Sequence, residues 1–316
     1  MKTRHAVLLP LALASAPLGG QEPAPSPPAE PASVLDYGED RWHRMTVPVS
    51  IDGRGPYNFI VDTGAERTVI SQELARSLDL GPGNKVRLHS MSEVSRIDTV
   101  KIAALEVGGK EVREIHAPAL QRVHIGAEGI LGVDSLKSRR VSFDFARQQM
   151  TVTSSRKTEE RWRGEAIVVV GRSRFGQLVL VDAAVDGQKV WVILDTGAQT
   201  TVGNSALRRK LEQKNRLRAT WPVEMMSVTG GRVKADQTVV KDIRLGDVDI
   251  RDMPIAFADV HPFRKLDLMD RPALLLGMDA LRLFERVSVD FANRKVRLLP
   301  AGRSERGGTR FASLGD

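Results

Sequence analysis

Two aspartates stand in the same four-residue setting. Asp-Thr-Gly-Ala occurs at 62–65 and again at 195–198, each time directly after a strongly apolar run. A carboxylate placed there is driven toward the core, where an unpaired charge is costly. If the fold brings Asp62 and Asp195 face to face, like charge and partial burial prevent both from ionising, so the pair holds one shared proton. The ionised member can then deprotonate a water while the protonated member hydrogen-bonds to a carbonyl oxygen.

The residues after each aspartate suit a loop that supports such a pair. Thr63 and Thr196 are expected to hydrogen-bond across the two loops and fix them. Gly64 and Gly197 let the backbone come close to the carboxylates and donate N–H groups.

Other acidic residues recur in both copies of the pattern. Asp134 and Asp279 each follow a repeated glycine, and we interpret them as caps of a short helix. Asp144 and Asp290 alternate with apolar residues and are interpreted as surface strand positions.

The chain repeats itself beyond these motifs. Three pairs of stretches match in the same order: 49–71 with 183–204, 104–112 with 242–250, and 128–152 with 273–299. An Asp-Gly turn between apolar runs predicts a hairpin in each copy. We therefore predict two homologous β-rich halves, 41–153 and 165–300, joined by a charged linker at 154–164 and related by a pseudo-twofold axis.

Only a few segments have helical spacing. These are 71–80 and 205–214, with Ser71 and Ser205 as candidate N-caps. The remainder is rich in short Val, Ile and Leu runs separated by Gly or Asp-Gly. The predicted fold class is all-β, with two closed or partly closed barrels and few short helices.

With these motifs together, the chain resembles the retropepsin-like aspartic peptidases, with both halves fused in one polypeptide. The resemblance covers roughly 41–300 and includes a second signature, two apolar residues and a glycine, at Ile130-Leu131-Gly132 and Leu275-Leu276-Gly277. It implies an endopeptidase without cofactor or metal, with Asp62 and Asp195 as catalytic residues. Ala65 and Ala198 complete the catalytic loops, and Leu131 and Leu276 pack beneath them.

The resemblance also implies a flap over the cleft from each half. The candidate flaps are 89–100 and 227–240, since pepsin-type enzymes have larger lobes and a Tyr on a single flap, and neither stretch between the motifs contains a Tyr. The flaps would pair with an extended polypeptide substrate through backbone hydrogen bonds. The residues expected at their tips are Met91, Ser92, Thr229, Gly230 and Gly231.

Composition limits the alternatives. Cysteine is absent from the 316 residues, which excludes disulfides and thiolate chemistry. The net charge is +8, but aromatics are only 5%, so we expect no nucleic-acid partner and interpret the basic cluster at 208–218 as a solvated face. Binding of an anionic surface by this cluster stays open. The six histidines lack metal-ligand spacing, and His89, His116 and His124 are interpreted as plain loop residues.

The N-terminal segment has the pattern of an export signal. Lys2 and Arg4 precede an apolar stretch at 6–18, which predicts a signal peptide at 1–20, followed by a Pro-rich linker at 21–40. We expect a bacterial periplasmic monomer, tethered to the inner membrane if the signal is not cleaved, with a flexible tail at 301–316.

Two non-catalytic interpretations remain open at this stage. The aspartates serve as turn residues in an inactive repeat protein, or the cleft holds an extended peptide of the cell envelope without cutting it. Both are separable from catalysis by single Asp→Asn substitutions.

Overall fold

The computed structural model describes residues 33–40, 43–92, 94–136, 139–162, 166–174, 177–180 and 182–301. The chain divides into two units, 1–30 and 31–316, and the description concerns the second. The predicted signal peptide and residues 302–316 of the predicted tail lie outside the described residues.

The first half is a closed barrel of six strands. In order around the ring they are β3 (Met45–Ile51), β4 (Arg54–Val61), β10 (Gly129–Leu131), β5 (Val69–Ser71), β9 (Lys110–Leu120) and β8 (Thr99–Val107). The ring closes because β8 pairs with β3, with Val49 opposite Val107. Closure leaves no free sheet edge in this ring.

The second half repeats this order. Its strands are β14 (Gln177–Leu180), β17 (Trp191–Leu194), β22 (Ala273–Leu276), β18 (Val202–Gly203), β21 (Val248–Phe257), β20 (Arg232–Leu245), β15 (Ala183–Val185) and β16 (Gln188–Lys189). Here β14 and β15 together take the place of β3, and β16 and β17 together take the place of β4, because β14 pairs with β17 and β15 pairs with β16.

Both predicted Asp-Gly hairpins are present. Asp52 and Gly53 have φ values of 48° and 74°, and Asp186 and Gly187 have values of 45° and 70°. Positive φ at both central residues is the type I′ geometry that matches strand twist. The turn fixes the register of the strands that lead to each Asp-Thr-Gly-Ala loop.

A sheet of six strands joins the halves. Its order is β1 (Ser33–Asp36), β12 (Gln149–Ser154), β11 (Arg139–Asp144), β23 (Phe284–Asp290), β24 (Lys295–Pro300) and β13 (Ile167–Arg174). The two halves meet where β11 pairs with β23 and Ser142 lies opposite Ser288. The hydroxyls of these two serines hydrogen-bond at 2.8 Å, which marks the pseudo-twofold axis.

The sheet corrects one expectation about the N-terminal linker. Residues 33–40, predicted as part of that linker, include β1 and a short strand β2 (Gly38–Glu39) that pairs with β3. Pairing with β12 satisfies the backbone groups of β1, so this part of the segment is ordered by contacts that its composition does not reveal.

The same sheet corrects the surface interpretation of Asp290. Its side chain is buried and accepts a hydrogen bond from Arg140 at 3.1 Å, whereas the equivalent Asp144 pairs with Arg286 at 2.8 Å and is more exposed. Burial acts to raise the pKa of Asp290, but hydrogen bonds from Asn293 and Arg140 outweigh it, and the net pKa is lowered. The residue is inside because β23 lies between strands of both halves.

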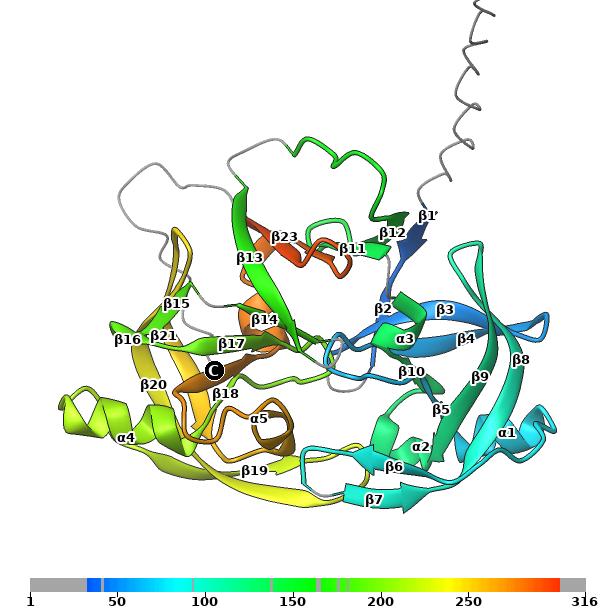
Figure 1. Ribbon diagram of the computed structural model, residues 1–316, viewed down its shortest axis with the longest axis horizontal. Helices are drawn as coiled ribbons and strands as arrows, with labels where there is room; N and C mark the ends of the chain where they lie inside the picture. Colours follow the sequence, from blue (N-terminus) through cyan, green and yellow to red (C-terminus); the bar gives the residue numbers. More distant parts are fainter. Residues whose placement is uncertain are drawn as a thin grey trace, which may run out of the picture. The chain divides into compact units, whose positions relative to one another are not determined.

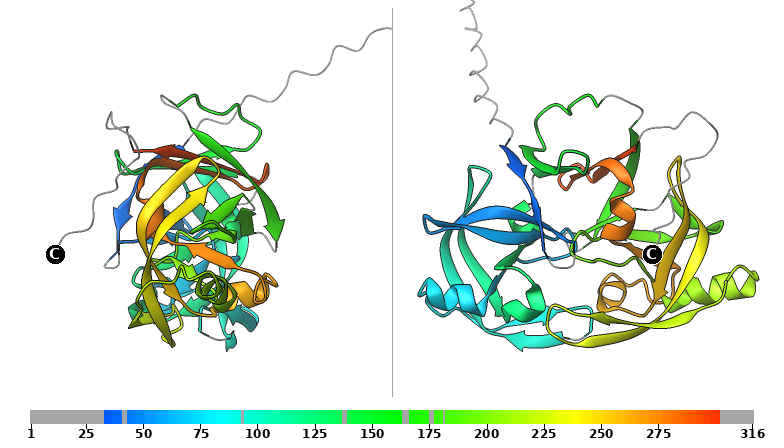
Figure 2. Two further views of the ribbon diagram at one scale, coloured as in Figure 1. Left: turned by 90° about the vertical axis from the view of Figure 1, so that its left-hand side faces the viewer. Right: turned by 180° about the vertical axis from the view of Figure 1, so that it is seen from behind.

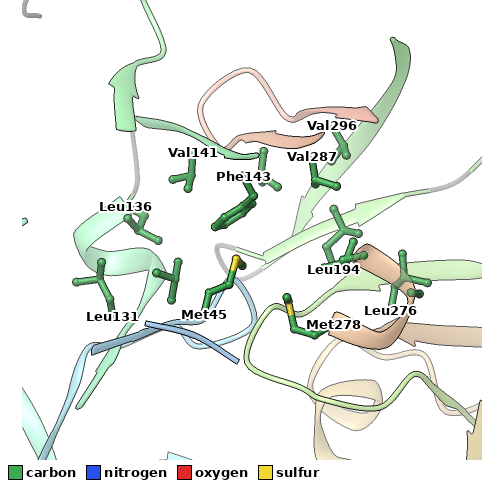
Figure 3. Close-up of a cluster of buried hydrophobic side chains, with 14 of the residues drawn as sticks. Met45, Leu131, Leu136, Val141, Phe143, Leu194, Leu276, Met278, Val287 and Val296 are labelled. Atoms are coloured by element: carbon green, nitrogen blue, oxygen red, sulfur yellow. The ribbon is translucent and has the colours of Figure 1, made fainter. Parts of the chain in front are cut away.

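One apolar core runs beneath both catalytic loops. Figure 3 shows buried apolar side chains from both halves gathered in one cluster, including Leu131, Phe143, Leu194 and Leu276. All four are buried, and Phe143 is completely inaccessible to solvent. Leu131 and Leu276 are thus part of the core that both halves share.

The described residues contain six short helices: α1 (Gln72–Ser77), α2 (Arg122–Ile125), α3 (Val133–Leu136), α4 (Ser205–Gln213), α5 (His261–Lys265) and α6 (Met278–Leu281). Ser71 caps α1 as expected, by accepting from the N–H of Leu74 at 3.0 Å. The cap of α4 is Asn204, not Ser205, because its Oδ1 accepts from Leu207 at 2.9 Å. No helix in the described part of the chain is long and apolar enough to span a membrane.

Two strand pairs form the flaps, which lie along the edge of the molecule opposite the central sheet (Figures 1 and 2). Flap 1 consists of β6 (Val86–His89) and β7 (Val94–Ile97), with a tip at 90–93 of which residue 93 is not described. Flap 2 consists of β19 (Trp221–Met226) and the first part of β20, with its tip at 227–231. The predicted all-β fold with two repeated halves is confirmed.

Candidate active site

Each candidate catalytic aspartate follows the last residue of a barrel strand. Asp62 comes after β4 and Asp195 after β17. The N–H of Asp62 donates to the carbonyl of Leu131 at 3.1 Å, and that of Asp195 donates to the carbonyl of Leu276 at 3.0 Å. The apolar-apolar-Gly motif of each half thus anchors the start of its catalytic loop.

The loop backbone holds the carboxylates in place. Oδ1 of Asp62 accepts from the N–H groups of Gly64 and Ala65 at 2.8 and 2.9 Å. Oδ1 of Asp195 accepts from Gly197 and Ala198 at 2.9 and 3.1 Å. The expected donation from the glycines is confirmed, and each alanine adds a second donor.

The two threonines lock the loops to one another. The N–H of Thr63 donates to Oγ1 of Thr196 at 3.0 Å, and the N–H of Thr196 donates to Oγ1 of Thr63 at 3.2 Å. Each hydroxyl donates in turn to a carbonyl of the opposite half, Thr63 to Leu194 at 3.0 Å and Thr196 to Val61 at 2.7 Å. This reciprocal arrangement satisfies the N–H and the hydroxyl of both threonines and confirms the expected bond across the pseudo-axis.

The carboxyl groups of Asp62 and Asp195 are neighbours across the pseudo-twofold axis, near enough for each to shift the pKa of the other. Each also lies against the glycine of the opposite loop, since a Cβ on Gly64 would come 2.6 Å from Cγ of Asp195 and a Cβ on Gly197 would meet Asp62 in the same way. Glycine is therefore required at both places by close approach.

Both carboxyls have raised pKa values. For Asp62, burial raises the pKa, partly offset by the N–H donors and by the positive charge of Arg44. For Asp195, burial and then the negative charge of Asp62 raise the pKa well above its usual range. A pair in this state titrates as a unit and retains one proton above the pH at which a solvated aspartate loses it.

Asp134 and Asp279, predicted to cap the following helices, lie inside the first turn of those helices rather than at the N-cap; each accepts from the next backbone N–H, Ser135 at 2.9 Å and Ala280 at 2.8 Å, and also binds the catalytic loop. Asp134 Oδ1 accepts from the N–H and the hydroxyl of Thr68 at 2.9 and 2.8 Å. Asp279 binds Thr201 in the same way, at 2.9 and 2.6 Å. These aspartates lie in the second position of α3 and α6, and they fasten the far end of each catalytic loop.

Thr68 and Thr201 were missed in the sequence. Their hydroxyls also accept from the N–H of Gly132 at 3.2 Å and Gly277 at 3.1 Å. The signal was available, because both threonines stand six residues after the aspartate in their own half. Gly132 and Gly277 leave no room for a side chain, since a Cβ on either would run into the backbone of the catalytic loop.

The flap tips meet over the cleft. Oγ1 of Thr229 donates to Oγ of Ser90 at 3.1 Å, and Gly231 lies directly against Ser92. Met91 lines the cleft, and a Cβ at Gly230 would come within 2.6 Å of the ring of His124. The predicted tip residues are thus brought together, and their contact with substrate stays a prediction.

The aspartates, the catalytic loops and the flaps line one cleft of about 370 Å³. Its first-half wall includes the apolar Val69, Leu120 and Ile130 beside charged residues such as Glu66, Arg67 and Arg87. Its second-half wall includes Met225 and the start of α5. His89, His124 and His261 also line it, which the interpretation of the histidines as plain loop residues did not anticipate. Among the described residues no three His, Asp or Glu side chains are grouped so as to hold a metal ion.

Comparison with protein families gives a match in each half. Residues 47–138 match the family described as "gag-polyprotein putative aspartyl protease", and residues 181–280 match the family described as "Aspartyl protease". A search of curated proteins found no match. Each matched range contains one Asp-Thr-Gly-Ala loop and its apolar-apolar-Gly partner. The chain therefore carries two aspartyl protease domains in tandem, which is consistent with a retropepsin-like aspartic peptidase of two fused halves.

Proposed function

We propose that the chain is an aspartic endopeptidase that hydrolyses peptide bonds with a water activated by the shared-proton pair of Asp62 and Asp195. The observation that carries the proposal is the pair itself: two neighbouring carboxyls from different halves, Asp195 buried and Asp62 half-buried, each held by two backbone N–H groups. Such a pair supplies a base and an acid in one place.

The two carboxyls differ in their surroundings, and this difference supports different resting roles for them. Arg44 is buried and bound to Asp40 at 2.9 and 2.6 Å, and its charge favours the ionised form of Asp62. Asp195 has the more strongly raised pKa, because it is buried and faces the charge of Asp62. Asp62 then accepts the proton of the attacking water, while Asp195 donates a hydrogen bond to the scissile carbonyl.

The substrate is an extended polypeptide lying between the loops and the two flaps. The flaps offer strand edges for backbone pairing, and the apolar part of the wall, formed by Val69, Leu120 and Ile130, suits an apolar side chain. The export pattern of residues 1–20 and the absence of cysteine support a place in the bacterial envelope, with envelope polypeptides as substrates.

The test uses a mixed peptide library and three single variants. Asp62→Asn and Asp195→Asn should each lower kcat/KM by about 10³-fold or more, because either change removes the shared proton and the acid–base pair. Asp247→Asn, at an exposed turn between β20 and β21, is the matched control and should cleave like the wild type. Equal cleavage by Asp62→Asn and the wild type contradicts the proposal. If the Asp→Asn variants bind peptide as well as the wild type does, and the wild type cleaves no peptide, the chain is a binding protein instead.

A further inference from the structure

Flap 1 is fastened to the opposite half of the molecule by a pair of histidines. Nδ1 of His89, at the end of β6, lies 2.5 Å from Nε2 of His261, the first residue of α5. The ring centroids are 4.6 Å apart. The N–H of His261 also donates to the carbonyl of Met91 at 3.2 Å. The end of β6 and the tip of flap 1 are thus joined to His261 by one side-chain and one backbone contact.

The two histidines are part of the cleft that contains the aspartates. Both rings line it, and they come from different halves of the chain. A substrate that enters from the flap side must separate flap 1 from α5, which breaks this contact. Closure of flap 1 over the aspartates therefore includes the free energy of the histidine contact.

A hydrogen bond between two imidazoles depends on their protons. One ring must donate and the other must accept through an unprotonated nitrogen. Two neutral rings, or one neutral and one protonated ring, can form the bond. When both are protonated each nitrogen carries a hydrogen, no acceptor remains, and two like charges face each other.

The charges around the pair act against double protonation in the closed state. Arg264 and Lys265 lie on α5 and Arg87 lies on β6, while Glu66 of the catalytic loop is paired with Lys265 at 2.7 Å. Burial, together with these cations, lowers the pKa of both rings, and Glu66 offsets this in part for His89.

The elements of flap 2 add little charge to this site. Glu224 of β19 lines the cleft but is paired with Arg232 at 3.0 Å. Thr229, which meets Ser90, does not titrate. The ring of His124 lies against Gly230 of flap 2.

We propose that His89 and His261 form a latch that positions flap 1 over the cleft while at least one ring is neutral, and that releases the flap when both are protonated. The sign follows from the proton balance. The open form binds more protons than the closed form in the range where the rings titrate, so closure is favoured at neutral pH and lost as pH falls. The link to substrate turnover rests on the proposed peptidase function; the movement of the flap does not.

The movement is measurable because the chain has no cysteine. Spin labels are attached at Val94→Cys on flap 1 and at Arg209→Cys on α4, two exposed positions. The parent chain carries Asp62→Asn, so that the flap distance is measured without peptide cleavage. Pulsed electron paramagnetic resonance should give a single distance between the two labels at about pH 8. A second population with a longer distance should grow toward about pH 5. Circular dichroism at each pH checks that the fold is retained.

His261→Gln removes the titrating ring at position 261 but keeps a side chain that can donate a hydrogen bond to His89 or accept one from it. In this variant the longer population should no longer depend on pH. His116→Gln, at an exposed position of β9 outside the cleft, is the control and should respond like the parent. A distance distribution that is constant with pH in the parent, or a pH response that persists in His261→Gln, overturns the latch.

Turnover gives a second and separable readout. If the chain cleaves peptides, His261→Gln should shift the acid limb of kcat/KM to lower pH, mainly through KM, since flap closure serves binding before chemistry. An unchanged acid limb with an intact distance response would detach the latch from catalysis. Absence of cleavage would overturn the peptidase proposal and leave the distance test standing.

Discussion

The loops after β9 and β21 occupy corresponding places in the two halves. Each contacts the flap of the opposite half, but the contacts differ. The first is eight residues long (121–128) and contains the four-residue helix α2, from which the ring of His124 lies against Gly230 of flap 2. The second is fifteen residues long (258–272), contains α5, and binds flap 1 through His261. The catalytic loops, by contrast, repeat the same hydrogen bonds.

This contrast distinguishes residues that must be the same in both halves of a pseudo-twofold site from residues that can differ between the halves. The aspartates, threonines and glycines face their own copies across the axis, so a change in one half disturbs both. The loops that receive the flaps do not touch each other's copies, and each can acquire its own contacts. Comparison of equivalent positions in the two halves therefore tests which parts are bound by symmetry.

The largest difference in stability is expected between Asp290 and Asp144. Asp290→Asn should cost about 3–5 kcal/mol of unfolding free energy, because it leaves the buried Arg140 without a counter-charge, whereas Asp144→Asn should cost about 1 kcal/mol or less at its more exposed site. Urea unfolding at neutral pH measures both. Equal losses would contradict the asymmetry.

The ion pair of Asp290 with Arg140 predicts that the free energy of unfolding depends on pH. The folded-state pKa of Asp290 is lowered from 3.8, so its contribution is complete above that value and is lost as pH falls through the folded-state pKa. The deficit of Asp290→Asn relative to the wild type should therefore shrink under acid conditions. A deficit that is constant with pH would show that the charge is not its source.

Thr63→Val and Thr196→Val should have similar, intermediate effects. Each removes one hydroxyl that accepts from an N–H and donates to a carbonyl of the opposite half, at a cost of about 1–3 kcal/mol. Because the contact is reciprocal, the double variant should lose less than the sum of the single losses, a coupling that a double-mutant cycle measures. Strict additivity would contradict the interlocked arrangement.

The smallest effect is expected at the centre of the joining sheet. Ser142→Ala and Ser288→Ala each delete one partner of a single half-buried hydrogen bond, worth about 0.5–1.5 kcal/mol. The two variants should be equally stable in thermal unfolding, since the axis passes between them. A clear difference between them would place the axis elsewhere.

The sequence predicts the parts of the molecule that occur twice. The Asp-Gly hairpins, the aspartate pair and the bond between Thr63 and Thr196 all follow from the repeat, because a motif that recurs in one order marks equivalent positions in two halves. Thr68 and Thr201 belong to the same class and were within reach of that argument.

The features that escape prediction are those formed once, between segments distant in the chain. The contact of His89 with His261 joins residues 172 positions apart and has no copy, so neither spacing nor composition indicates it. Burial of Asp290 depends on β23 pairing with a strand of the other half, and alternation along a single strand does not reveal which strand covers it. Side-chain pairing across halves needs the three-dimensional register.

Joining of the halves by β11 and β23 within one polypeptide has a consequence for how the cleft responds to dilution. A site assembled from two separate chains comes apart as the protein becomes scarce, since association is bimolecular. Here the partner of each aspartate is tethered, and its effective concentration is set by chain geometry rather than by abundance. A few copies per cell would keep the carboxyl pair assembled as completely as many.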